Sequence, residues 1–101
     1  MIHIYIHYPT LKEARRISKM LLHKHLAACV VFIKHEGLYW WKKKMVHGRG
    51  VITFVVTQKK HYKNIETLVK KHHSYEVPAI FELPIGRVLP SYEQWLIKET
   101  K

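Results

Sequence analysis

The chain has 101 residues, which suits one small domain, and 48% of them are hydrophobic, which excludes a disordered polar chain. Eighteen Lys and Arg residues stand against seven acidic residues, all of them Glu, so the formal net charge is +11. This excess suits contact with a polyanion, but the basic residues are spread along the whole sequence, which favours a general adjustment of charge.

The cysteine content and the apolar runs indicate a compartment. Cys29 is the sole cysteine, so no disulfide forms within the chain, and a reducing environment is favoured. No apolar run, that at residues 27–33 included, approaches the roughly 20 residues that a membrane-spanning helix needs. No signal peptide is recognisable at the start of the sequence. We therefore expect a cytoplasmic protein with no membrane partner.

The beginning of the chain, as far as residue 27, predicts a strand followed by a helix. Isoleucines at positions 2, 4 and 6 alternate with His3, Tyr5 and His7, which predicts a strand with two different faces. Thr10 and Glu13 have the spacing of a capping box, and apolar residues recur behind them at helical spacing. This pattern predicts a helix over residues 11–27.

A long hairpin is expected next. Residues 29–41 and 45–58 are rich in β-branched and aromatic side chains, and the lysines between them, Lys42, Lys43 and Lys44, are the expected turn. Gly48 and Gly50 lie inside the returning strand and predict a bulge or a bend there.

The rest of the chain predicts a helix over residues 61–72, a strand over residues 79–83, and a short C-terminal helix that a capping box of Ser91 and Gln94 would open. The whole order, βαββαβ plus a helix, is that of the α+β ferredoxin-like fold, in one domain spanning residues 1–101. Helices would cover one face of an antiparallel sheet. The other face would carry His3, Tyr5 and His7, and it would need solvent or a partner, which indicates oligomerisation.

Five stretches carry a resemblance to a known family. They read LAACV at 26–30, YWW at 39–41, HHSYEVP at 72–78, LPI at 83–85 and YEQWL at 92–96. In this order and at this spacing they resemble the CutA family of divalent-cation tolerance proteins, over essentially the whole chain. The resemblance implies a homotrimer similar to the PII signalling proteins, an association with copper or other divalent ions, and no enzymatic reaction. Some copper-binding relatives carry a cysteine where this chain has Ile6, which argues against a thiolate ligand there.

Nine histidines suggest metal ligands, because neutral imidazole binds Cu, Zn and Ni. His72 and His73 are the candidate metal ligands, since some relatives are assigned copper contacts there. Adjacent helical residues point about 100° apart, so a further ligand such as His61, His7 or a residue of a neighbouring subunit would be needed. The alternative, which base rates favour, is that both histidines interact with the helix dipole. His3 and His7 share a strand face, where symmetry would gather imidazoles, although simple packing is the commoner role.

The resemblance also implies an intersubunit cleft or interface, with a ligand expected between His72, Tyr75, Glu76 and Trp40. The residues assigned to it are Tyr39, Trp40, Trp41, Tyr75, Glu76, Pro78 and Trp95. The aromatic triplet beside three lysines could instead be a stacking platform for single-stranded nucleic acid, but the resemblance favours packing.

No catalytic motif is recognisable, so we expect no catalytic residues and no required cofactor, with Cu(II) or another divalent cation as the only candidate. The leading hypothesis is a trimeric divalent-cation tolerance protein. Two alternatives stay open: a basic trimer that binds polyanions such as nucleic acid, and a PII-like sensor of a small anionic metabolite.

Overall fold

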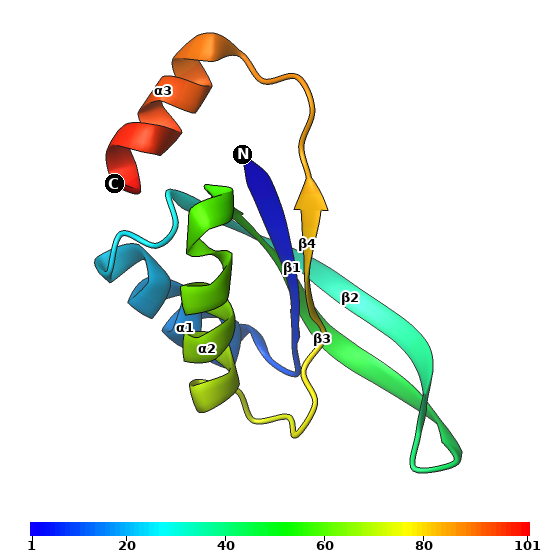
Figure 1. The fold of residues 1–101 in the computed structure, drawn as a ribbon. Helices are drawn as coiled ribbons and strands as arrows, with labels where there is room; N and C mark the ends of the chain where they lie inside the picture. Colours follow the sequence, from blue (N-terminus) through cyan, green and yellow to red (C-terminus); the bar gives the residue numbers. More distant parts are fainter.

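The computed structural model describes all 101 residues. The chain forms four strands and three helices, in the order β1 (Ile2–Tyr8), α1 (Leu11–His23), β2 (Cys29–Trp41), β3 (Lys44–Thr57), α2 (Tyr62–His72), β4 (Ile80–Pro84) and α3 (Pro90–Glu99), with a 3₁₀ turn at Lys59–His61 before α2 (Figure 1). The strands make one antiparallel sheet in the order β2-β3-β1-β4. The predicted ferredoxin-like α+β fold is therefore confirmed.

The core lies between the sheet and the helices α1 and α2. The alternation along β1 turns its three isoleucines toward the helices, where they are almost completely buried. They pack with Ala14, Ile17 and Leu21 of α1 and with Ile65 and Val69 of α2. Each such side chain contributes roughly 1.5–3 kcal/mol relative to exposure, so this layer fixes which face of the sheet the helices cover.

The capping box predicted at the start of α1 is confirmed in part. The amide nitrogen of Glu13 donates to Thr10 Oγ1 at 3.2 Å, as a capping box requires. The Glu13 carboxylate does not complete the box and instead accepts a hydrogen bond from the amide of Ser74. The helix ends at His23, four residues before the predicted end. His25 adopts a left-handed φ of 55°, and the amide of Leu26 donates back to the Leu21 carbonyl, which terminates the helix in a Schellman motif.

The C-terminal helix begins differently from the prediction. Pro90 is its first residue and Leu89 its N-cap, with no side-chain capping bond. The capping box predicted at Ser91 and Gln94 is therefore wrong. Proline favours the first helical position because its φ is preset and its missing N–H needs no partner there, so the helix starts two residues earlier than the Ser91 box would place it. None of the helices has the length and apolar character that crossing a membrane requires.

The hairpin of β2 and β3 extends well beyond the rest of the sheet. β1 pairs with β3 only from Val51 to Thr57, whereas β2 and β3 stay paired as far as Trp41 and Lys44. Residues 35–50 therefore project as a free ribbon, here called the arm (Figure 1). The arm explains a radius of gyration of 14.1 Å, against about 13 Å for a compact domain of this length.

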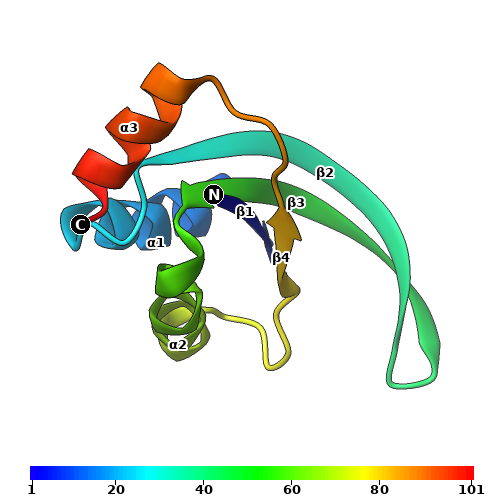
Figure 2. The same ribbon diagram turned by 45° about the horizontal axis from the view of Figure 1, so that its top comes forward.

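Two details of the arm bear on the sequence-based expectations of a bulge or a bend and of a three-lysine turn. The pairing register is continuous, so the glycines produce no bulge, although the ribbon does bend (Figure 2). The turn consists of Lys42 and Lys43 alone, with φ values of 49° and 66°, and Lys44 already belongs to β3. Positive φ at both central residues is the geometry of the two-residue type I′ hairpin.

The face of the sheet opposite α1 and α2, here called the open face, carries aromatic and aliphatic side chains. Tyr5 stacks on Phe81 with ring centres 4.4 Å apart and meets Phe54 edge-on. Val31 and Ile33 of β2 lie on the same face, since Val31 pairs with Phe54 across the ladder. Val31, Ile33 and Phe81 are each more than 40% exposed.

Candidate functional site

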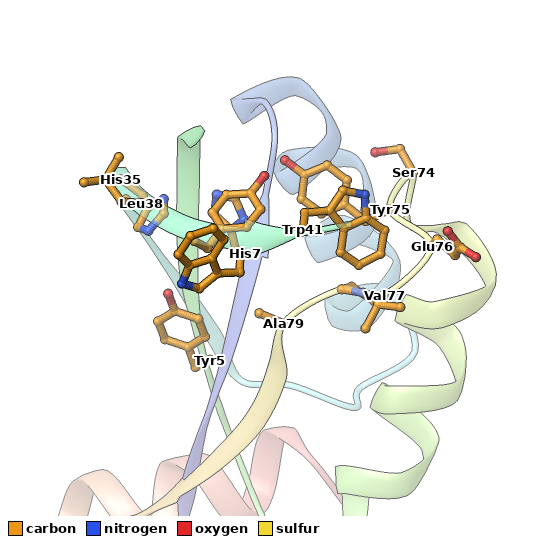
Figure 3. Close-up of a pocket in the computed structure, with 14 residues that line it drawn as sticks. Tyr5, His7, His35, Leu38, Trp41, Ser74, Tyr75, Glu76, Val77 and Ala79 are labelled. Atoms are coloured by element: carbon orange, nitrogen blue, oxygen red, sulfur yellow. The ribbon is translucent and has the colours of Figure 1, made fainter. Parts of the chain in front are cut away.

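A pocket of about 720 Å³ lies between the arm and the segment that follows α2. This volume falls within the range of roughly 300–1,000 Å³ that is usual for small-molecule sites. Fourteen residues line it: Tyr5, His7, His35, Gly37, Leu38, Tyr39, Trp40, Trp41 and residues 74–79. Figure 3 shows His7 between the arm side, with His35 and Leu38, and the opposite wall, with Ser74 and Glu76.

His7 and His35 form a pair of imidazoles in the wall of this pocket. Their ring centres are 4.3 Å apart and their planes are inclined by 59°. Nε2 of His7 and Nδ1 of His35 are buried and have no hydrogen-bond partner. Buried polar atoms normally have a partner, so two free nitrogens in one pocket wall need a physical reason.

The surroundings of His7 determine the charge state of its imidazole. The exposed fraction of this residue is 7%. Burial lowers the pKa of His7 below its usual value, and the neighbouring His35 and His73 lower it further. Because removal from water disfavours the charged form, His7 is neutral at neutral pH. A neutral imidazole with an unpartnered nitrogen can bind a metal ion or a hydrogen-bonding ligand.

His73 has a structural role beneath the pocket. Its Nε2 donates to the carbonyl oxygen of His7 at 2.7 Å, and its Nδ1 accepts from the amide of Tyr75 at 2.9 Å. Its ring stacks on Tyr8, and the Glu13 carboxylate lies 3.5 Å from Nδ1. Both ring nitrogens are thus in use, and His73 joins β1, α1 and the pocket wall.

The predicted metal ligands His72 and His73 are not brought together as a ligand pair. His72 is the last residue of α2 and does not line this pocket, and its carbonyl accepts a hydrogen bond from Arg16. Within one chain, no three His, Cys, Asp or Glu side chains are grouped as metal ligands would be. Metal binding by this pair stays a prediction, and it requires His73 to give up one of its two hydrogen bonds.

Most of the residues predicted for an intersubunit cleft do meet in one place. The pocket is lined by six of the seven, namely Tyr39, Trp40, Trp41, Tyr75, Glu76 and Pro78. Trp95 lies instead on α3, with its ring 5.5 Å from that of Tyr92, and outside the pocket. His72, expected beside the ligand, is also outside it.

Sequence reasoning missed His35 as a pocket residue. Its spacing from the aromatic triplet could have indicated this role. Positions 35, 37, 39 and 41 alternate along β2 with the same parity, so they share one face of the strand. The partner of His35, His7, has the same parity as Tyr5 on β1. The sequence does not indicate that these two rings, on strands that are not neighbours in the sheet, come within 4.3 Å of each other.

Comparison with known proteins agrees with this geometry. A sequence model of the CutA1 divalent ion tolerance protein family matches residues 2–99. The divalent-cation tolerance protein CutA of Pyrococcus horikoshii is 33% identical over 101 residues, covering 100% of this chain and 99% of the relative. That of Archaeoglobus fulgidus is 38% identical over 93 residues, covering 92% and 91%.

Solved structures give the same result. The structure of the A. fulgidus protein, described as a periplasmic divalent cation tolerance protein, superposes with a TM-score of 0.97 at 35% identity and covers 100% of both chains. CutA1 from P. horikoshii superposes with a TM-score of 0.95 at 32% identity, covering 100% of this chain and 99% of that one. The sequence and the fold together establish that this chain belongs to the CutA1 divalent ion tolerance protein family.

Proposed function

We propose that this chain is a non-enzymatic, cytoplasmic protein that binds Cu(II) or another divalent transition-metal ion and works as a homotrimer. Relatives named for divalent-cation tolerance support the class of ligand. The observation that carries the proposal is the pair of unpartnered imidazole nitrogens, His7 Nε2 and His35 Nδ1, in the wall of the pocket.

The proposed metal chemistry uses these two neutral imidazoles. A histidine nitrogen binds Zn(II) at about 2.0–2.1 Å, and imidazole also suits Cu(II) and Ni(II). Ring centres 4.3 Å apart are close for two ligands of one ion, so the rings turn apart slightly to admit it. Water or a neighbouring copy completes the coordination, since one chain supplies no third ligand of the usual types. His72 is the alternative ligand that the resemblance suggests.

The proposed trimer follows from apolar surface that one copy leaves in water. Trp40 and Leu38 on the arm are 72% and 70% exposed, and the open face adds Val31, Ile33 and Phe81. Large apolar side chains left exposed in this number usually mark an interaction site. A second copy is the occupant that the CutA resemblance predicts. It would cover the open face and border the pocket.

Isothermal titration of the full chain with Cu(II) and Zn(II) at neutral pH tests the metal proposal. We expect binding at one ion per chain, weakened at least about tenfold in His7→Phe and in His35→Phe, because each variant loses one ligand but keeps a ring in the pocket. His23→Ala, at an exposed position on α1, is the matched control and should bind as the wild type does.

Two outcomes would redirect this proposal. Loss of binding in His72→Ala alone would move the site to the end of α2. Weak binding that no single substitution changes would show that the metal binds to scattered histidines and not to one site, and the proposal would fail.

The pocket supports a second candidate function, that of a PII-like sensor of a small ligand. Its volume is sufficient, and five of its fourteen lining residues are Tyr or Trp, which suits a small molecule with a flat ring. A thermal-shift screen of anionic metabolites separates this function from metal binding. A ligand of the pocket should raise the melting temperature of the wild type in the presence of a chelator but not that of Tyr75→Ala.

A further inference from the structure

The fold gathers more than half of the basic side chains on its helical side. Ten of the eighteen Lys and Arg residues lie on or beside α1 and α2, and all ten are exposed: Lys12, Arg15, Arg16, Lys19, Lys24, Lys59, Lys60, Lys63, Lys70 and Lys71. The same segments, residues 12–24 and 59–71, contain only two carboxylates, Glu13 and Glu66. This surface, here called the helical layer, therefore holds +8 of the net +11 formal charge.

The charge of the helical layer is almost unneutralised. Lys63 is the only one of the ten whose charged group lies within ion-pair distance of a carboxylate, 3.2 Å from Glu66. The other carboxylate, that of Glu13, is turned inward to the Ser74 amide and His73. Surface cations in stable proteins are usually interspersed with anions, so a dense and unpaired set indicates a polyanionic partner.

The basic residues of the helical layer are spread over an extended surface. Lys12, Arg15 and Lys19 recur at intervals of three and four residues along α1, which places them on one side of that helix over roughly 10 Å. α2 carries basic residues at both ends and lies beside α1 (Figure 1), with Arg16 reaching across to the carbonyl of His72. Cations spread over two adjacent helices suit a polymer with repeated charges better than a single small anion.

We propose that the helical layer binds the phosphate backbone of double-stranded nucleic acid without sequence preference. Lys and Arg contacts to phosphates position a protein on a duplex without reading its sequence. Single strands are usually held by aromatic stacking platforms, and the exposed tryptophans lie on the arm and α3 instead. Insertion into a membrane surface needs large apolar side chains among the basic ones, and the helical layer offers only Leu11 and Leu22, which are 38% and 39% exposed.

This proposal is independent of the metal proposal, because the two surfaces differ. The pocket with His7 and His35 is formed by β1, the arm and the segment after α2, and none of its lining residues is a Lys or Arg of the helical layer. The open face of the sheet, which the trimer would bury, lies opposite α1 and α2. A trimer would therefore leave its helical layers accessible and could bind a duplex and a metal ion together.

Fluorescence anisotropy with a labelled 20-base-pair DNA duplex of random sequence tests the proposal on the full chain. Each neutralised phosphate contributes about 0.9 to the slope of log K against log salt concentration. Five contacts would thus weaken binding about 500-fold between 50 and 200 mM NaCl. Absence of binding at 50 mM NaCl, or binding that does not respond to salt, would overturn the proposal.

A pair of variants with equal net charge separates the helical layer from overall charge. The first changes Lys12, Lys19, Lys70 and Lys71 to Gln, and we expect it to weaken binding at least about 20-fold at 100 mM NaCl and to reduce the salt slope.

The control variant removes four charges outside the layer, by changing Lys44, Arg87, Lys98 and Lys101 to Gln. It should change the affinity less than about threefold, since these exposed residues lie outside α1 and α2. Equal weakening in both variants would show that net charge alone drives binding. The last measurement uses vesicles that contain anionic phospholipid. Preference of the protein for these vesicles over the duplex would likewise reject the proposal.

Discussion

Gly50 lies where β3 parts from β1, and we predict that Gly50→Ala is the most destabilising substitution by alanine at any glycine of the chain. The φ angle of Gly50 is +155°, which L-residues rarely adopt. An added Cβ would lie 2.1 Å from the carbonyl oxygen of Tyr8 and 3.0 Å from that of Pro9. Both oxygens belong to the backbone, so the strand and the turn after β1 would have to move apart.

Two terms set the size of the effect. The unfavourable backbone angle costs roughly 1–2 kcal/mol, and forcing a methyl group into a packed site costs roughly 1–3 kcal/mol. We therefore expect Gly50→Ala to lower the free energy of unfolding by about 2–5 kcal/mol, a large part of the 5–15 kcal/mol that is typical of folded domains.

Urea denaturation at one fixed protein concentration measures this loss against two other glycines. Gly86→Ala is the control, because nothing lies within 4 Å of its added Cβ. Gly48→Ala should give an intermediate loss, since its Cβ would meet the ring of Tyr39 at 2.8 Å and that side chain can move. If the free energies of unfolding of Gly50→Ala and Gly86→Ala differed by less than about 0.5 kcal/mol, the steric argument would be refuted.

Three further predictions concern the turn, the pocket and the first helix. Replacing Lys42 by Asn and Lys43 by Gly should stabilise the protein by about 1–2 kcal/mol in thermal unfolding, because both positions have positive φ; an unchanged midpoint would contradict this. The lowered pKa of His7 means that the unfolded chain takes up a proton at a higher pH than the folded chain does. Stability should therefore fall as the pH drops below about 6.5 and stop falling below the lowered value, and a His7→Phe variant with an unchanged pH profile would disprove this origin. Thr10→Ala should cost about 1 kcal/mol in urea denaturation, through loss of the bond to the Glu13 amide, whereas Thr10→Ser should keep most of it.

The sequence predicts the fold well because its signals are local. Alternation along β1 and helical spacing in α1 and α2 give the order of the elements, and that order restricts the topology to very few choices. The errors arise where one local signal overrides another. Pro90 moves the start of α3 ahead of the Ser91 capping box, and the left-handed His25 ends α1 before its apolar pattern does.

The site is less predictable because its chemistry depends on contacts between distant residues. A sequence shows two adjacent histidines at the end of α2 but not that one of them, His73, bonds to the His7 carbonyl, 66 positions away. Likewise Glu13 has the right spacing for a capping box, yet Ser74 comes within 3.0 Å only in the folded chain. The concentration of charge on the helical layer also depends on the tertiary structure. Its basic residues come from two separate segments, and in the sequence they appear evenly spread.

The mass of the protein in dilute solution is the most direct test of the central claim that copies of this chain cover the open face. One chain has a mass of 12.1 kDa, so a trimer has three times this, about 36 kDa. We predict that light scattering coupled to size exclusion gives the trimer mass at micromolar concentration, and that Phe81→Glu on the open face lowers it. A wild-type mass near 12.1 kDa under the same conditions would contradict the account.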